Sequence, residues 1–409
     1  MKQQASNPDG HWNWPVPFSH RQAVRCGQMI WVSGQMAMSA AGKLDQAADL
    51  PAQIATCMQN VGRVLAGCGC GLGELVKLLC FYVNDGSVDE TDFLSKVGAA
   101  LPAGCQPAVT AVPTPYLPYS GIKVVIEAYA MIATDGSPLP RSYIPADGLS
   151  ALPKPFASGI RCGKMIYISA QSPIDAAGQV LHPGEIIAQT RQVMSQIKTA
   201  LAGFGTGFDD VVKMNRWYVG HGKTEDFEPA ALACAENYKE PGPAATGIPI
   251  PRHARDGQQL KIEAVAMLGE DGGHLPRRNV WPDSLWDWTI DIPYYHGLKC
   301  HDMIFLGGQV SLDSAGRAVN PGNMKAQTGQ AMVHIGSILA ELGAGYSDIC
   351  KLTTMYAGPS GAEALHENLR IRSAFFSPDG PATTDIALPV QAYPGMIIEI
   401  DAFAMAEPD

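Results

Sequence analysis

The sequence predicts an α+β protein of three tandem domains that close into a pseudo-threefold ring within one chain. The first observation is a repeat: VSGQ, ISAQ and LGGQ end in Gln35, Gln171 and Gln309, which are separated by 136 and then 138 residues. The second is that later columns of the chain, a lysine, a tyrosine and a Pro-Ala pair, keep the same offsets. Offsets preserved along a whole unit indicate fused duplications. We expect three domains, at residues 1–140, 141–277 and 278–409.

The elements of one unit follow from the periodicity of its apolar residues. Residues 29–35 are a short β run, and the apolar residues that follow residue 53 recur every three or four positions, which predicts an amphipathic helix ended by glycines. Residues 74–83 are predicted as a buried strand, 92–101 as a second helix and 123–132 as the last strand. The order ββαβαβ predicts one sheet with two helices on one face.

The last strand indicates why the units associate. In KVVIEAYAMI both alternating faces are largely apolar, so the side of the sheet away from the helices also needs cover. Two further copies of the same sheet supply that cover. The chain is therefore expected as a closed ring of three units, present as a monomer or as a dimer of such rings.

Composition excludes several classes of function. The chain is 46% hydrophobic and 17% charged, without the roughly 18 consecutive apolar residues of a membrane span, so no membrane partner is expected. Its net charge of −10 disfavours nucleic acid as a partner. The polar N-terminus does not have the pattern of a secretory signal, and with ten cysteines typical of a reduced chain it suggests a cytoplasmic protein. We expect no metal and no other cofactor, because His pairs with ligand spacing are missing.

The repeated motifs resemble the Rid/YjgF family of reactive-intermediate deaminases. The shared features are an SGQ strand end, a helix that carries glutamine, a VVK strand, a Pro-Ala turn and a terminal IEA strand, and they cover nearly all of the chain three times over. The resemblance implies chorismate-mutase-like domains, arranged as a trimer with a ligand cleft at each interface. It also implies hydrolysis of imines or enamines to ketones and ammonia.

One family feature is absent from its usual position. In deaminating members an arginine after the Pro-Ala turn grips the substrate carboxylate, but this chain has Val109, Ala245 and Thr383 there. The neighbouring residues are threonines and supply no cation in its place. The sequence therefore predicts clefts without the usual anchor, which disfavours a standard 2-imino acid deaminase.

Other site residues are carried over by the resemblance. The cleft acid maps to Glu127, Glu263 and Asp401, although each could instead pair with a lysine of the next strand. The family serine maps to Ser33 and Ser169, but to glycine in the third unit. The tyrosine that precedes the first strand maps to three different residues, His20, Phe156 and Tyr294.

Polar residues private to one unit add candidates for substrate binding. The second unit has Asn215 and Arg216 on its central strand, and Arg252 and His253 in the loop PRHARDG, whereas the third unit places Asp385 near Thr383. Solvated loop charge is the plain alternative for Arg252. Arg216 lies mid-strand, where an unpaired guanidinium is costly, so we expect it to pair with a carboxylate across an interface or to bind an anionic ligand.

These observations favour a hydrolase that acts on a carbon–nitrogen bond of a small-molecule substrate in an interdomain cleft. One alternative is a cyclic-amide hydrolase resembling cyanuric acid hydrolase or barbiturase, with Ser33 or Ser169 activated by Lys77 or Lys213. Another is a non-catalytic ring that binds a ligand. The sequence leaves the substrate and the working cleft open.

Overall fold

The computed structural model describes residues 1–44, 49–358, 361–377 and 379–408, and it shows three six-stranded sheets, each with two α-helices. The first domain contains β1 (Gln3–Ser6), β2 (Ala23–Cys26), β3 (Met29–Gln35), α1 (Leu50–Gly67), β4 (Leu75–Val83), α2 (Glu90–Ala99), β5 (Ala108–Thr114) and β6 (Val124–Met131). The second contains β7 (Arg141–Tyr143), β8 (Gly159–Cys162), β9 (Met165–Gln171), α3 (Ile186–Gly203), β10 (Val211–Val219), α4 (Thr224–Ala235), β11 (Ala244–Ile250) and β12 (Leu260–Met267). The third contains β13 (Arg277–Val280), β14 (Gly297–Cys300), β15 (Met303–Leu306), α5 (Met324–Glu341), β16 (Ile349–Ala357), α6 (Ala362–Ser373), β17 (Ala382–Leu388) and β18 (Ile398–Met405).

All three sheets have the same strand order, which in the first domain is β1-β2-β3-β6-β4-β5. Strands β4 and β5 are parallel, and the other neighbours are antiparallel. The predicted order ββαβαβ was wrong in two respects, because it omitted the edge strand β1 and also β5, which contains Pro113. A proline is tolerated there because β5 is the other edge strand of its sheet, so its missing N–H removes little from the ladder.

The predicted helices are confirmed and have clear local causes. Helix α1 begins after Asp49, whose carboxylate accepts the N–H of Ala52, and it ends at Gly67. The residues of its apolar stripe are buried against the sheet: Ile54, Met58, Val61 and Leu65. Equivalent helices α3 and α5 have the same length of 18 residues.

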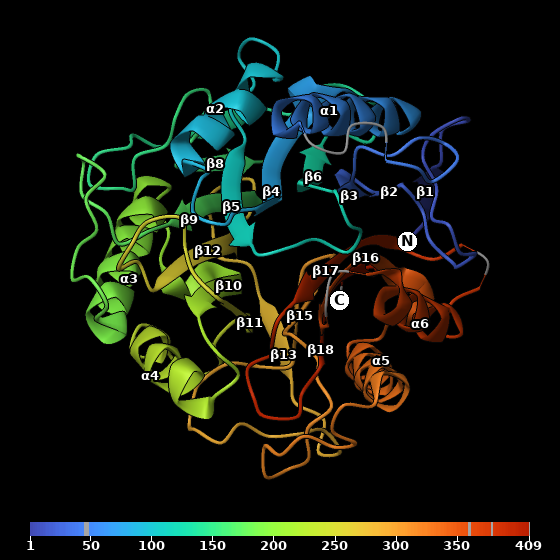
Figure 1. Ribbon diagram of the computed structural model, residues 1–409. Coiled ribbons are helices and arrows are strands. Elements are labelled where there is room, and N and C mark those ends of the chain that lie inside the picture. The colour runs from blue at the N-terminus through green and yellow to red at the C-terminus, as the bar shows by residue number, and fades with distance from the viewer. Residues whose placement is uncertain (45–48, 359–360, 378, 409) are drawn as a thin grey trace.

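The three domains surround a common centre, with the strands toward the middle and the helices at the rim (Figure 1). The inner sheet faces share one apolar cluster, to which every domain contributes aromatic residues: Trp31, Tyr129, Tyr167, Phe305 and Phe403. The prediction of a ring in which the sheets cover one another is therefore confirmed.

The repeated Pro-Ala pairs have a structural role in closing this ring. The carbonyl oxygen of each proline accepts a backbone N–H from the loop that opens the next domain, and the third such bond returns to the first domain. These bonds are Ala157 N–H to Pro107 O at 3.3 Å, Tyr295 N–H to Pro243 O at 3.2 Å and Arg21 N–H to Pro381 O at 3.1 Å. We refer to the junctions of domains one and two, two and three, and three and one as the first, second and third interfaces.

Candidate functional site

Three buried ion pairs cross the interfaces near the centre of the ring. In each, a lysine of one central strand meets a carboxylate on the last strand of the next domain: Lys77–Glu263 at 2.6 Å, Lys213–Asp401 at 2.8 Å and Lys351–Glu127 at 2.9 Å. All six side chains are at most 5% exposed. The pairs therefore run cyclically around the chain, as the hydrogen bonds of the prolines do.

These pairs hold the carboxylates that the resemblance had assigned to the cleft. Glu127 also accepts hydrogen bonds from Tyr129 Oη at 2.5 Å and Thr353 Oγ1 at 3.0 Å. Burial alone would raise the pKa of Glu127, but Lys351 and the hydroxyls of Thr384 and Tyr129 hold it below its usual value. A carboxylate committed in this way stabilises the ring and is poorly placed to exchange protons with a ligand.

The two predicted serines are likewise held by the main chain. Ser169 Oγ donates to Ala157 O at 2.6 Å and accepts the N–H of Val109 at 2.8 Å, so it joins the first and second domains. Ser33 makes the equivalent bonds, to Arg21 O at 2.6 Å and from the N–H of Thr383 at 2.8 Å. Both hydroxyls thus have a donor and an acceptor partner within the fold.

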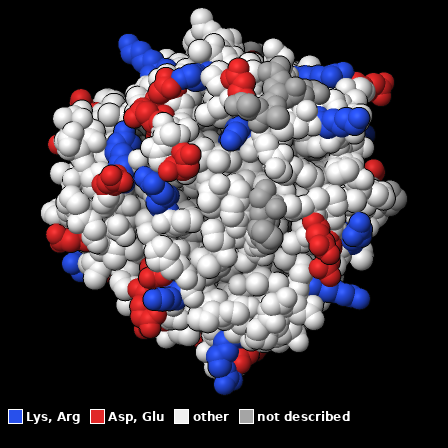
Figure 2. Space-filling view, viewed as in Figure 1, with Lys and Arg blue, Asp and Glu red and all other residues white. Residues whose placement is uncertain are grey.

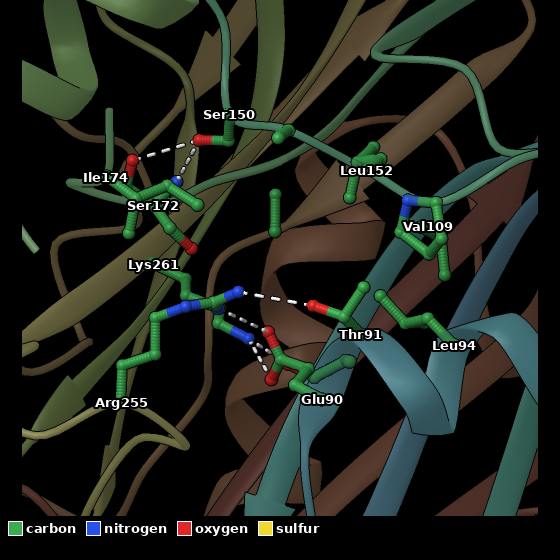
Figure 3. Close-up of a pocket in the computed structure, with 14 residues that line it drawn as sticks. Glu90, Thr91, Leu94, Val109, Ser150, Leu152, Ser172, Ile174, Arg255 and Lys261 are labelled. Carbon is green, nitrogen blue, oxygen red and sulfur yellow. Dashed lines mark hydrogen bonds and ion pairs between the residues drawn. The ribbon is translucent and has the colours of Figure 1, made fainter. Parts of the chain in front are cut away.

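The first interface contains a pocket of about 400 Å³ that is lined by an internal ion-pair cluster. Glu90, at the start of α2, receives Lys261 Nζ at 2.5 Å and lies 3.8 Å from Arg255 Nη1, so two cations of the second domain converge on one carboxylate of the first (Figure 3). Arg255 also donates to Thr91 Oγ1 at 3.3 Å. Predicted Phe156 lies nearby, 8% exposed, in the core beneath α2. The cations of this pocket are already neutralised.

The third interface contains a second internally neutralised cation. Arg372 of α6 is ion-paired with Asp385, and it also donates to Thr383 Oγ1 at 3.1 Å, beside the position where the family arginine was expected. Both members of the pair are buried. Predicted His20 lies in this region, stacked on Phe18 with ring centroids 4.3 Å apart, and burial lowers the pKa of its imidazole to about 4.

The second interface differs, because its guanidinium has no carboxylate partner. Arg216 of β10 is 2% exposed and lies over the rings of Phe227 and Tyr218, with its Cζ 4.8 and 5.5 Å from their centroids. It is also beside the thiol of Cys234. Within the described part of the chain Arg216 forms no ion pair, and its Nε has no hydrogen-bond partner. The sequence predicted clefts without the family arginine and named Arg216 as a candidate for binding an anionic ligand. Each interface has a buried cation from another position, and among the described residues the cation of the second interface has no ion-paired anion.

A glycine explains why Arg216 is unpaired. The residue beside it on β11 is Gly247, which occupies the column of Asp385 and of Ala111. A Cβ at Gly247 would lie 3.1 Å from Arg216 Nη2 and 2.7 Å from the ring of Phe227. Gly247 also lines a hollow of about 270 Å³ between the second and third domains. The missing side chain therefore lets Phe227 and Arg216 pack against this strand, and it leaves Arg216 without the carboxylate that Asp385 provides at the third interface.

A buried carboxyl group, Glu399 of β18, lies in the wall of the same hollow. It is 5% exposed, and its Oε2 has no hydrogen-bond partner among the described residues. Burial raises the pKa of Glu399 to about 8, with nearby Asp401 adding to the rise and Lys213 and Arg216 opposing it. At neutral pH the group is therefore mostly protonated and able to donate its proton.

Gly308 makes room for this carboxyl. A Cβ there would lie only 2.0 Å from Glu399 Oε1, so a larger residue would displace the acid. At the second interface two glycines, one from each domain, thus accommodate neighbouring side chains that a Cβ would displace. It combines an unpaired cation, an acid that is protonated at neutral pH and a hollow between them, which is the composition expected of a binding or active site.

The remaining predicted residues are placed apart from this hollow or behind it. Asn215 donates to Glu263 Oε1 at 2.9 Å and belongs to the central ion pairs. Tyr294 is buried in the second interface, where its ring centroid lies 5.8 Å from that of Tyr238. His253 is buried, with Nε2 3.1 Å from Trp217 O, and burial lowers the pKa of its imidazole well below the usual value. Arg252 is half exposed and lies 3.5 Å from Asp256.

Sequence reasoning missed Glu399, Arg372, Glu90 and Lys261. One signal was available: Glu399 lies two residues before Asp401, in a column where the other units have Val125 and Lys261, and such variety marks a position free to diverge. Residues two apart share one face of a strand, so the pattern alone does not tell which acid faces the neighbouring lysine. The partners of Arg372 and Glu90 come from other elements and have no local signal.

Other site types find little support in the described regions. No three His, Cys, Asp or Glu side chains there are grouped as metal ligands. Among the helices described, none has the length and apolarity to cross a membrane. On the face shown in Figure 2, basic and acidic residues are interspersed around the rim and the middle is mostly uncharged. That face has no broad basic surface of the kind that nucleic acid requires.

The comparisons with known proteins agree with the threefold repeat. The family profile described as Endoribonuclease L-PSP matches residues 15–132, 149–268 and 290–406. A RutC family protein of Pyrococcus horikoshii is 31% identical over 112 residues, which are 27% of this chain and 86% of the relative. A 2-iminobutanoate/2-iminopropanoate deaminase of Mus musculus is 29% identical over 117 residues, 28% of this chain and 83% of that protein. Each relative thus corresponds to one third of this chain.

One solved structure resembles most of the ring. A chorismatase crystal structure aligns with a TM-score of 0.54, covering 81% of this chain and 93% of that one, at 12% identity. At this identity the likeness concerns the fold alone. It agrees with the observation that three related units are joined in one compact chain.

Proposed function

The chain belongs to the endoribonuclease L-PSP family, whose profile matches it three times over most of its length, and on that premise we propose that it is a small-molecule hydrolase of a carbon–nitrogen bond. The bond is that of an imine or enamine, and the reaction takes place at the second interface. The similarity to an imino acid deaminase supports this class of reaction. A chain of this kind has three interfaces but, on this proposal, one working site.

One observation carries the choice of interface: within the described residues Arg216 has no ion-paired carboxylate, in contrast to the interface cations at the other two junctions. At the first interface Glu90 neutralises Lys261 and Arg255, and at the third Asp385 neutralises Arg372. A buried guanidinium without an anion is costly, and a ligand that brings a carboxylate offsets that cost. The charge-assisted bond to such a ligand contributes about 1.5–3 kcal/mol.

The proposed mechanism uses Glu399 as a general acid and then as a base. Glu399 donates its proton to the imine nitrogen, and water adds to the imine carbon. The Glu399 carboxylate accepts a proton from the added water and then donates it to the amine nitrogen of the resulting carbinolamine. The C–N bond breaks as ammonia leaves, and the proton of the hydroxyl group returns to Glu399 as the carbonyl forms. The products are a carbonyl compound and ammonia, and the overall change is the addition of one water. Arg216 holds the anionic group of the substrate throughout.

Ammonia release tests the proposed function. Imines and enamines generated in solution from amino acids are offered to the wild-type protein, and ammonia formation above the spontaneous rate is the expected result. A non-catalytic protein would bind the carboxylate ligand but would not raise the rate of ammonia formation above the spontaneous rate. That result would exclude the catalytic part of the proposal. The cyclic-amide alternative has no supporting observation, since Ser33, Ser169, Lys77 and Lys213 are each held by other partners.

The pH profile gives a first prediction. Because the pKa of Glu399 is raised to about 8, its acid form predominates below that pH and is lost above it. We expect kcat to fall about tenfold per pH unit above pH 8, as for any reaction that requires one protonated group. Initial rates measured from pH 6 to pH 10, corrected for spontaneous hydrolysis, check this. A wild-type profile without a decrease across this range would exclude Glu399 as the acid.

Gly247→Asp gives a second prediction, because it copies the arrangement of Asp385 beside Arg372. The new carboxylate neutralises Arg216, so we expect affinity for a carboxylate ligand to fall by about 10- to 100-fold without loss of unfolding free energy. The ring of Phe227 must rotate to admit the side chain. Gly247→Ala is the matched control, since it adds the Cβ without the charge. Equal affinities of the two variants would contradict the assignment of Arg216 as the anion site.

A further inference from the structure

The walls of the second interface are unusually aromatic. Of the eleven residues that line its hollow, four are Phe227, Trp286, Trp288 and Tyr393, and one, Glu399, has a carboxyl group. Apart from these five, the lining is glycine, alanine and aliphatic side chains. A ligand there meets ring faces and edges rather than hydrogen-bonding groups, apart from the acid and the guanidinium beside Gly247.

The four rings are arranged around one space. Phe227 and Trp288 are nearly parallel, 12° apart with centroids at 5.8 Å, and Tyr393 lies 5.6 Å from Phe227 at a tilt of 53°. Trp286 meets Trp288 edge-on at 4.5 Å. Such rings come from three separate segments: helix α4, the loop before β14 and the loop before β18. Aromatic surfaces in this arrangement favour another flat π system through offset or edge contacts.

The first interface lacks this character at equivalent positions. Thr91 occupies the column of Phe227 and Arg255 the column of Tyr393, and the lining of that pocket contains no aromatic side chain.

The third interface is intermediate, because Trp12, Trp14 and Tyr119 occupy the columns of Trp286, Trp288 and Tyr393. Leu365 replaces Phe227 there, however, and Arg372 is neutralised by Asp385. The full set of four rings is therefore found at the interface whose guanidinium is unpaired. That combination is not required by the fold, because the first domain and the second domain close their interface without it.

We propose that the ligand of the second interface is a compound with one planar, unsaturated ring and a single anionic group, an inference that rests on the proposed function. The anion binds Arg216, the ring lies against Phe227, Trp288 and Tyr393, and the atom attached to the ring near Glu399 receives its proton. One anion matches one unpaired guanidinium, since a second would be buried among apolar walls without a partner.

Four probe compounds test this inference by calorimetry on the full-length protein. Benzoate has the ring and the charge, cyclohexanecarboxylate has the charge on a saturated ring, propionate has the charge alone, and benzamide has the ring alone. We expect benzoate to bind about five- to tenfold more tightly than cyclohexanecarboxylate, and both more tightly than propionate. Benzamide is expected to bind at least about tenfold more weakly than benzoate, because it lacks the charge.

The variant Trp288→Leu separates the ring contact from the anion contact. It should reduce the affinity for benzoate to that for cyclohexanecarboxylate and leave the affinity for propionate unchanged. Equal affinities of benzoate and cyclohexanecarboxylate in the wild type would overturn the ring inference and leave the anion site intact. Failure of all three carboxylates to bind would instead overturn the proposed function on which it rests.

Discussion

Glu399→Gln lowers kcat for ammonia release by about 10²- to 10⁴-fold, the usual contribution of a positioned general acid, if the account of the second interface is right. The amide has nearly the same shape but does not transfer a proton to the imine nitrogen. Affinity for a carboxylate ligand should persist, because Arg216 is untouched. Rates at saturating substrate, compared with calorimetric binding of the product, separate the two effects.

The same substitution at another interface is the control. Glu90→Gln changes a buried carboxylate of the first interface into an amide, and it should leave kcat within about twofold of wild type because that pocket is not the working one. Unfolding free energy of Glu399→Gln should be unchanged or higher, since a neutral amide is no harder to bury than a carboxyl group with a raised pKa. Equal losses of kcat in the two variants would exclude a specific role for Glu399.

Lys351→Met lowers the free energy of unfolding by about 3–5 kcal/mol, the range found when one member of a buried ion pair is removed. Lys351 and Glu127 are fully buried, and the pair joins the third domain to the first. Without the ammonium, Glu127 has to remain charged without a cation or become protonated, and either is unfavourable. Chemical denaturation followed by circular dichroism measures the loss. A loss below about 1 kcal/mol would show that these pairs do not hold the ring together.

A double variant identifies the cause of that loss. Lys351→Met combined with Glu127→Gln removes the stranded charge and keeps an acceptor for Tyr129 and Thr353. It should recover at least half of the lost free energy of unfolding, because replacing both members of a buried ion pair by uncharged groups often changes stability little. If the double variant is as unstable as the single one, lost packing and not the unpaired carboxylate is responsible.

The fold was predictable because the sequence contains three copies of the same structural unit. Any single copy of the strand–helix pattern is ambiguous, but columns kept at fixed offsets removed most of that ambiguity. The omitted strand β5 is the instructive failure. It is an edge strand that contains Pro113, and a proline ordinarily argues against a strand.

The site was predictable only in outline. The sequence indicated Arg216 with two possible partners, a carboxylate across an interface or an anionic ligand. Arg216 forms no ion pair among the described residues, and its Nε has no hydrogen-bond partner there, which favours the second. Sequence reasoning did not find Glu399, because Asp401 shares the same strand face and was the acid that the family pattern indicated. The pairing of Glu90 with Lys261 joins residues 171 positions apart and depends on how domains dock, which no local pattern encodes.

Calorimetric titration with benzoate or pyruvate tests most directly the claim that one interface of three has a free anion site. We expect one carboxylate bound per chain of the wild type and none bound to Arg216→Met. The unfolding free energy of Arg216→Met should not fall, because an apolar side chain of similar length replaces an uncompensated buried charge. Three equivalent sites per chain, or binding that survives in Arg216→Met, would contradict this claim.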